Sequence, residues 1–166
     1  MGEQADPELV RRISDLILSH EKILGIHDLM VHDYGPGRLM VSLHAEVSGD
    51  GNIYVLHDVI EHAEAAIDEA IGCESVIHMD PVETNNAEVT RVKGLVQEAA
   101  RAIDERITVH DFRMVKCSDY CNLIFDAVLP LDSPLSNDAF RARMQEETEK
   151  RVGRCNLVLK IDRPYV

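Results

Sequence analysis

The sequence predicts an α+β fold of two tandem α-β-β-α-β units, each a three-stranded sheet with two helices on one face. Two observations support this prediction. Apolar residues recur at helical spacing in some segments and alternate with polar residues in others, in the order helix, strand, strand, helix, strand. The same order then recurs in the second half of the 166-residue chain. The two expected domains span residues 6–82 and 84–166.

Three sequence blocks recur at a nearly constant spacing, which indicates an internal duplication. His27-Asp28 corresponds to His110-Asp111, 83 residues later, and the other two blocks are offset by 82 residues. The paired blocks are ILGIHDLMV with RITVHDFRMV, LMVSLHAEV with NLIFDAVLP, and GCESVIHMDP with RCNLVLKIDRP.

Each expected element of the first unit has its own local signal. Asp6-Pro7 is a good helix start, and apolar residues follow it at helical spacing. The turn Gly35-Pro36-Gly37 joins two strands into a hairpin, and Gly72 ends a second helix that has one apolar stripe. The expected elements are a helix from Pro7, strands at 26–33 and 38–47, a helix with its stripe over 56–71, and a strand at 74–80.

The second unit repeats this pattern. Its expected elements are a helix at about 86–106, strands at 109–117 and 121–129, a helix at 136–152 and a strand at 155–162. Helices packed on one face of a small sheet define an open-faced, ferredoxin-like sandwich. One face of each sheet is then left uncovered, and its polar residues become candidates for function.

Composition excludes several classes of protein. Thirty acidic residues against 17 basic ones give a net charge of −13, which argues against nucleic acid as a partner and is compatible with attraction of cations. Four cysteines are too few for a disulfide scaffold at this length. No stretch approaches the roughly 18 apolar residues of a membrane span, and the N-terminus does not resemble a signal peptide.

Strand alternation gathers metal-ligating residues on the uncovered face of the first sheet. Leu39, Val41, Leu43, Ala45 and Val47 face the helices, so His44 faces away, and the same alternation turns His78 and Asp80 outward in the last strand. A single exposed strand histidine is usually only a solvated polar residue. Imidazoles that converge with a carboxylate from separate segments favour Zn²⁺ or a neighbouring transition metal.

The second unit carries a different set at the matching positions. Asp126, Lys160 and Asp162 stand where the first unit has His44, His78 and Asp80. A lysine is protonated at neutral pH and only donates hydrogen bonds, so Lys160 is expected to repel a cation and to pair with the two aspartates. Metal is therefore expected in the first unit and not in the second.

Four segments resemble the carboxy-terminal domain of cation diffusion facilitator transporters: GIHDL, SLHAEV, LHDVIEHAEAAI and VIHMDP. The resemblance implies a cytoplasmic domain of this same element order that hangs below a six-helix membrane domain and dimerises. It also implies that metal bound near the dimer interface regulates transport. The family's cytoplasmic zinc ligands fall on five positions, His27, His44, His57, His78 and Asp80.

The resemblance also sets the expected partners and location. They are a homodimer, the transporter's own membrane domain and divalent metal ions, at the cytoplasmic face of the bacterial inner membrane. Zinc is the expected ion, although manganese, iron, cobalt and cadmium also accept histidine and carboxylate ligands. The second half of the chain resembles the extended carboxy-terminal region of some bacterial members.

Two other functions are weighed against this one. A stand-alone small-molecule-binding module built from tandem α/β repeats would have a glycine-lined pocket between the copies. A zinc enzyme would need a general base beside an open coordination position, for which Glu46 is a candidate. The sequence has no H-E-x-x-H, no G-x-S-x-G and no phosphate-binding glycine loop, so an enzyme is not expected.

Overall fold

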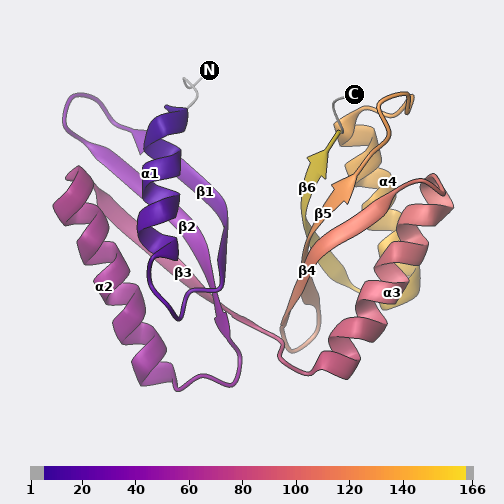
Figure 1. Cartoon of the computed structure of the whole chain (residues 1–166), viewed down its shortest axis with the longest axis horizontal. Coiled ribbons are helices and arrows are strands. Elements are labelled where there is room, and N and C mark those ends of the chain that lie inside the picture. Colours follow the sequence, from indigo (N-terminus) through magenta and orange to yellow (C-terminus); the bar gives the residue numbers. More distant parts are fainter. Residues whose placement is uncertain (1–5, 164–166) are drawn as a thin grey trace. The chain divides into compact units, whose positions relative to one another are not determined.

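The computed structural model describes residues 6–163, which form four helices and six strands; residues 164–166 of the second expected domain lie outside this part (Figure 1). The chain divides into two compact units: unit 1, which ends at Pro81, and unit 2, which begins at Val82. The elements are α1 (Pro7–Leu18), β1 (Gly25–Asp33), β2 (Leu39–Ser48), α2 (Ile53–Ile71), β3 (Glu74–Val82), α3 (Asn86–Ile103), β4 (Thr108–Lys116), β5 (Cys121–Val128), α4 (Asn137–Val152) and β6 (Cys155–Asp162).

The α+β class is confirmed, but two separate three-stranded sheets are not. The strands follow one hydrogen-bonded order, β1-β2-β3-β4-β5-β6. The link between β3 and β4 arises because β3 continues past Pro81 to Val82, which pairs with Val115. Next to this pair, the amide of Glu83 donates to the carbonyl of Met114 at 2.7 Å. All six strands therefore belong to one hydrogen-bonded sheet. The expected sequence of elements, α-β-β-α-β, still occurs twice along the chain.

In unit 1, α1 and α2 lie against the strands (Figure 1) and share one apolar cluster with them. α1 begins at the expected place, because Asp6 accepts a hydrogen bond from the amide of Glu8 at 3.0 Å and a proline occupies the first turn. α2 ends at Gly72, whose φ of 74° is a left-handed conformation that glycine adopts at low cost. The buried cluster includes Ile13, Ile17, Val41, Leu43, Ala45, Ile60, Ala63, Ile67 and Ile77.

A β-bulge interrupts the first hairpin of each unit at the same place. In unit 1 the pairing of β1 with β2 shifts between His27 and Met30, and Asp28 has a φ of 50°. In unit 2 the pairing of β4 with β5 shifts between His110 and Arg113, and Asp111 has a φ of 49°. Asp28 and Asp111 are the described non-glycine residues with positive φ, a conformation that aspartate tolerates better than most side chains. The shared bulge is consistent with the internal duplication.

The helices of unit 2 pack over a second apolar cluster, to which α3 contributes Val96 and α4 contributes Phe140. β5 and β6 are parallel, and their register sets Asp126 beside Lys160. Within residues 6–163, no helix combines the length and the apolar character that crossing a membrane requires.

Candidate metal centre

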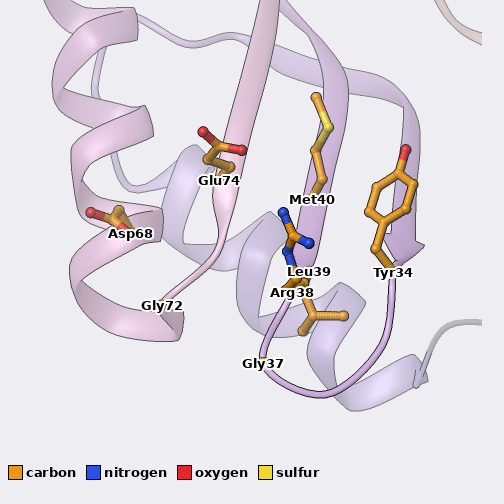
Figure 2. A pocket seen from close by; sticks show the side chains of 8 residues that line it. All are labelled: Tyr34, Gly37, Arg38, Leu39, Met40, Asp68, Gly72 and Glu74. Atoms are coloured by element: carbon orange, nitrogen blue, oxygen red, sulfur yellow. The ribbon is translucent and has the colours of Figure 1, made fainter.

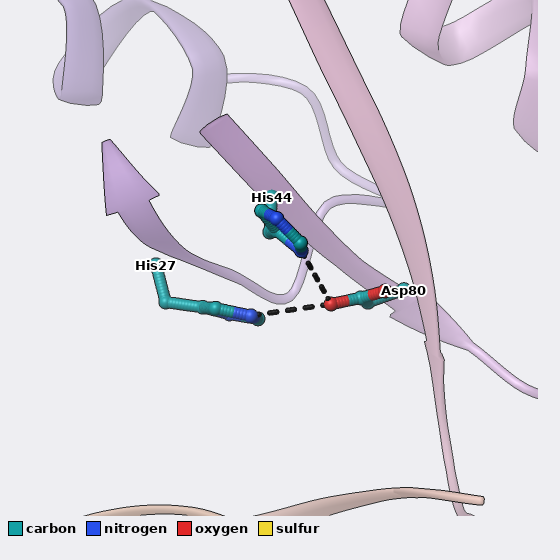
Figure 3. A group of neighbouring side chains, drawn as sticks. All are labelled: His27, His44 and Asp80. Atoms are coloured by element: carbon teal, nitrogen blue, oxygen red, sulfur yellow. Dashed lines mark hydrogen bonds and ion pairs between the residues drawn. The ribbon is translucent and has the colours of Figure 1, made fainter. Parts of the chain in front are cut away.

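His27, His44 and Asp80 meet on unit 1, each from a different strand (Figure 3). Asp80 Oδ2 lies 3.1 Å from His27 Nε2 and 2.9 Å from His44 Nδ1. One possible ligand atom from each residue lies within 4.8 Å of the other two. Across residues 6–163, this is the one group of three histidine, cysteine or acidic side chains with such a spacing.

Strand pairing explains why these residues converge. His27 is the last paired residue of β1 before the bulge, and it stands directly across from His44 on β2. Their ring centroids are 4.9 Å apart. β3 supplies Asp80, which is only 4% exposed and contacts both imidazoles. The sheet fixes the backbone of all three residues, so their side chains need little further ordering when an ion binds.

His78 extends the group towards solvent. Its Nε2 lies 3.2 Å from Asp80 Oδ1, and its ring centroid is 4.7 Å from that of His44. The His78 side chain is 66% exposed, whereas that of His27 is 8% exposed. The two oxygens of Asp80 therefore point to different imidazoles, Oδ2 to the inner pair and Oδ1 to the outer one.

His57, the fifth predicted ligand, is not brought to this group. It lies on α2 with a side chain that is 69% exposed, and its Nε2 is 3.7 Å from Glu61 Oε1, one helical turn on. This contact lies within its own helix. Four of the five predicted residues lie together, and the fifth lies on a helix surface.

The structure adds one residue to the site that sequence reasoning considered only as a base for an enzyme. Glu46 has no exposed surface, and its Oε1 lies 3.0 Å from His27 Nδ1. Strand alternation had placed Glu46 on the same face as His44, two residues away. That alternation was the available signal, but the pairing with His27 depends on the register of β1 and β2.

The histidines and the carboxylates of this group shift one another's pKa values. Burial alone would lower the pKa of His27, but its hydrogen bonds to Asp80 and Glu46 and the charges of these carboxylates raise the pKa to about 9. Burial would raise the pKa of Asp80, yet hydrogen bonds from His27 and His44, with the charges of His44 and His78, lower that pKa below its ordinary value. The cluster thus keeps a carboxylate ionised and stabilises positive charge beside it.

The donor set fits a transition metal. Imidazole nitrogens with one carboxylate form the usual ligand set of zinc, and ligand atoms around a tetrahedral zinc ion lie roughly 3.4 Å apart. The two contacts of Asp80 Oδ2, at 3.1 and 2.9 Å, are close to that spacing. His27, His44, His78 and Asp80 are the residues that would hold the ion, which would supply positive charge in place of the proton on His27.

In unit 2 the corresponding side chains pair with one another, one ammonium group with two carboxylates. Lys160 Nζ lies 3.3 Å from Asp126 Oδ2 and 3.3 Å from Asp162 Oδ2. This pairing confirms the interaction expected from the sequence. The ammonium group lies between the two carboxylates, where they would otherwise attract a metal cation.

A pocket of about 520 Å³ lies elsewhere on unit 1, at the hairpin turn and the C-terminal end of α2 (Figure 2). Arg38, Asp68 and Glu74 give its wall charges of both signs, and the other lining residues are Tyr34, Gly37, Leu39, Met40 and Gly72. None of the five predicted metal ligands lines it. This pocket and the histidine group are therefore separate features of unit 1.

Comparison with known proteins identifies the class to which unit 1 belongs. Residues 5–82 match the family described as the cytoplasmic domain of cation efflux proteins. Unit 1 is therefore a member of this family, which confirms the resemblance to cation diffusion facilitators, and the match ends at Val82. A comparison with curated protein sequences gives no match.

Several solved structures are similar to part of the chain. The zinc form of CzrB, a candidate zinc transporter, is 30% identical; the match covers 49% of this chain and 93% of CzrB, with a TM-score of 0.44. The metal-bound C-terminal domain of the CzcD transporter from Thermotoga maritima is 12% identical over 48% of this chain and 94% of its own, with a TM-score of 0.44. A variant of the MamM C-terminal domain is 15% identical, covers 46% and 93%, and has a TM-score of 0.43.

Proposed function

We propose that unit 1 is the metal-sensing and dimerisation domain of a divalent cation efflux transporter. The observation that carries this proposal is the convergence of His27, His44 and His78 on the two oxygens of one carboxylate, that of the buried residue Asp80. Three imidazoles that converge on one buried carboxylate concentrate metal-ligating atoms at one point of the sheet. They are a common arrangement for binding a divalent ion.

Zinc is the ion that this donor set favours. Manganese, iron, cobalt and cadmium accept the same nitrogen and oxygen ligands, so the donor set does not exclude them. CzrB has been described in a zinc form and CzcD in a metal-bound form, which supports the assignment of a transition metal to this chain. The site serves regulation and not catalysis.

His57 has a separate place in this proposal. Its imidazole is exposed on α2 and can bind an ion that His27 and His44 do not reach. It serves either a second ion beside His78 or an ion held jointly with a partner protomer.

Regulation follows from charge. Each chain carries a net charge of −13, so two protomers repel one another, and salt screens this repulsion only in part. Cations bound by imidazoles and carboxylates offset the repulsion and favour one arrangement of the homodimer. We place unit 1 at the cytoplasmic face of the bacterial inner membrane, attached to a membrane domain. Metal binding would then shift the population of the transporter towards the conformation that fits the metal-bound homodimer.

Unit 2 acts as a diverged, metal-free copy in this proposal. The salt bridges of Lys160 with Asp126 and Asp162 support a scaffold role, since an ammonium group already lies between the two carboxylates. The small-molecule module considered from the sequence has no comparable support.

The test is thermal stabilisation by zinc in the full chain. Zinc at 100 times its dissociation constant is expected to stabilise the parent by about 2.7 kcal/mol. The double variant His78→Ala, Asp80→Ala is expected to lose this effect. The matched control Asp58→Ala, His62→Ala removes the same residue types from an exposed pair on α2 and should keep it. Equal stabilisation of the double variant and the parent would refute the site assignment.

A further inference from the structure

Glu46 has a completely buried carboxylate next to His27, one of the four proposed metal ligands His27, His44, His78 and Asp80. Its residue is 0% exposed, and Oε1 lies 3.0 Å from His27 Nδ1. Burying a carboxylate destabilises a protein unless hydrogen bonds and opposite charge compensate. The residues on either side of it in β2, Ala45 and Val47, are buried and apolar. A charged side chain at this position therefore points to a role in the site.

The contact fixes which nitrogen of His27 faces the ion. A neutral imidazole has one N–H donor and one nitrogen acceptor, and metal-bound histidines usually donate the second nitrogen's hydrogen to a carboxylate or carbonyl. Without metal, Nδ1–H donates to Glu46 and Nε2–H donates to Asp80 Oδ2, 3.1 Å away. An ion held by Asp80 would replace the hydrogen on Nε2, while Glu46 keeps the hydrogen on Nδ1 and so leaves the Nε2 lone pair for the ion. The opposite tautomer would place a lone pair against the Glu46 carboxylate and a hydrogen at the metal position.

Gly25 provides the room that this carboxylate needs. Gly25 stands directly across from Glu46 in the pairing of β1 with β2. A Cβ atom at Gly25 would lie 2.7 Å from Glu46 Oε2 and 3.1 Å from its carboxyl carbon. A larger residue at this position would therefore force the Glu46 carboxylate to move from where it contacts His27. Glycine at this strand position is thus explained by close approach of a side chain, not by turn geometry.

Unit 2 provides an internal comparison. The same register position pairs Thr108 with Val128, so both the carboxylate and the space for it are missing there. His110, the counterpart of His27, instead has its Nε2 2.9 Å from Thr108 Oγ1. Gly25 and Glu46 thus occur together in unit 1, which has the histidine group. Both are replaced in unit 2, where Lys160 pairs with the aspartates instead.

We propose that Glu46 is the positioning residue of the metal site, which holds His27 in the tautomer that presents Nε2 to the ion, and that Gly25 supplies the necessary space. This inference rests on the proposed function of unit 1. It assigns a role in metal affinity to two residues outside the ligand set.

The test is zinc titration calorimetry on the full chain. Loss of an outer-shell partner typically lowers metal affinity about 10- to 100-fold, and this is the loss expected for Glu46→Leu. Glu46→Gln should lose less, because the amide oxygen still accepts a hydrogen bond from Nδ1. Gly25→Ala should weaken zinc binding although Glu46 is present. Glu74→Gln, which removes an exposed carboxylate from β3, is the control and should bind as the parent does.

A purely structural role would lower the melting temperature of the zinc-free variants and leave the zinc affinity of the folded protein unchanged. Nitrogen NMR of the His27 ring separates the two cases, and zinc on Nε2 with hydrogen on Nδ1 is the expected result. Parent-like affinity in folded Glu46→Leu or Gly25→Ala, or zinc on Nδ1, would overturn the inference alone. Absence of zinc binding by the parent would overturn the proposed function itself.

Discussion

Replacement of Asp80 by alanine removes the carboxylate on which three imidazoles converge, and the structure sets the size of the effect. Asp80 is 4% exposed and has histidine contacts at 3.1, 2.9 and 3.2 Å. Breaking a buried ion pair from one side costs about 3–5 kcal/mol. The side chains of His44 and His78 are 38% and 66% exposed, so solvent weakens their share. We expect zinc-free Asp80→Ala to lose about 3 kcal/mol of unfolding free energy at pH 7, at the lower end of that range.

The assay is urea unfolding followed by circular dichroism, with a chelator present to remove metal. Asp80→Asn should lose less than Asp80→Ala, since an amide oxygen still accepts one hydrogen bond. The exposed residue Asp68 gives the control, and Asp68→Ala should stay within about 0.5 kcal/mol of the parent.

The pH dependence gives a second check on Asp80. Its folded-state pKa is lowered, so its stabilising contribution is present above the unfolded pKa of about 3.9 and is lost as the pH falls through the lowered value. The difference between parent and Asp80→Ala should therefore shrink in acid. A difference below about 0.5 kcal/mol at pH 7 would refute the reasoning, because it would mean that the buried carboxylate is not coupled to the imidazoles.

Two further predictions follow from the same charges. The pKa of His27 is raised to about 9 from an ordinary value near 6.5, so its stabilising contribution to the metal-free protein is fully present below about pH 6.5 and is lost as the pH rises through 9. Urea unfolding between pH 6 and 10 should show this loss in the parent and not in His27→Ala. In unit 2, Lys160→His removes the ammonium group between Asp126 and Asp162 and should add one weaker zinc equivalent per chain. An unchanged zinc stoichiometry by elemental analysis would contradict the idea that Lys160 takes the place of a cation.

Strand alternation was sufficient to place His44, His78 and Asp80 on one face, because the side-chain period of a strand depends only on local geometry. It could not place His27 with the same certainty, since the bulge after this residue breaks the period of β1. The resemblance to cation diffusion facilitators supplied His27 and His57. The structure brings the first of these to the group and leaves the second on the surface of α2.

The register between strands explains what sequence reasoning missed. Gly25 reads as a loop or strand-start residue until its pairing with Glu46 is known, and that pairing is a tertiary property. The six-stranded order was missed for a related reason. Val82 falls at the expected domain boundary, and only the fold reveals that it pairs with Val115.

X-ray absorption of the zinc-loaded full chain tests the central claim most directly, because it reports the type of atom bound to the ion. The chain has four cysteines as well as its histidines, so nitrogen and sulfur coordination are distinct outcomes. If His27, His44, His78 and Asp80 hold the ion, the spectrum should show nitrogen and oxygen ligands at about 2.0–2.2 Å with imidazole scattering. Sulfur ligands at about 2.3 Å would contradict the account, because no cysteine belongs to this group.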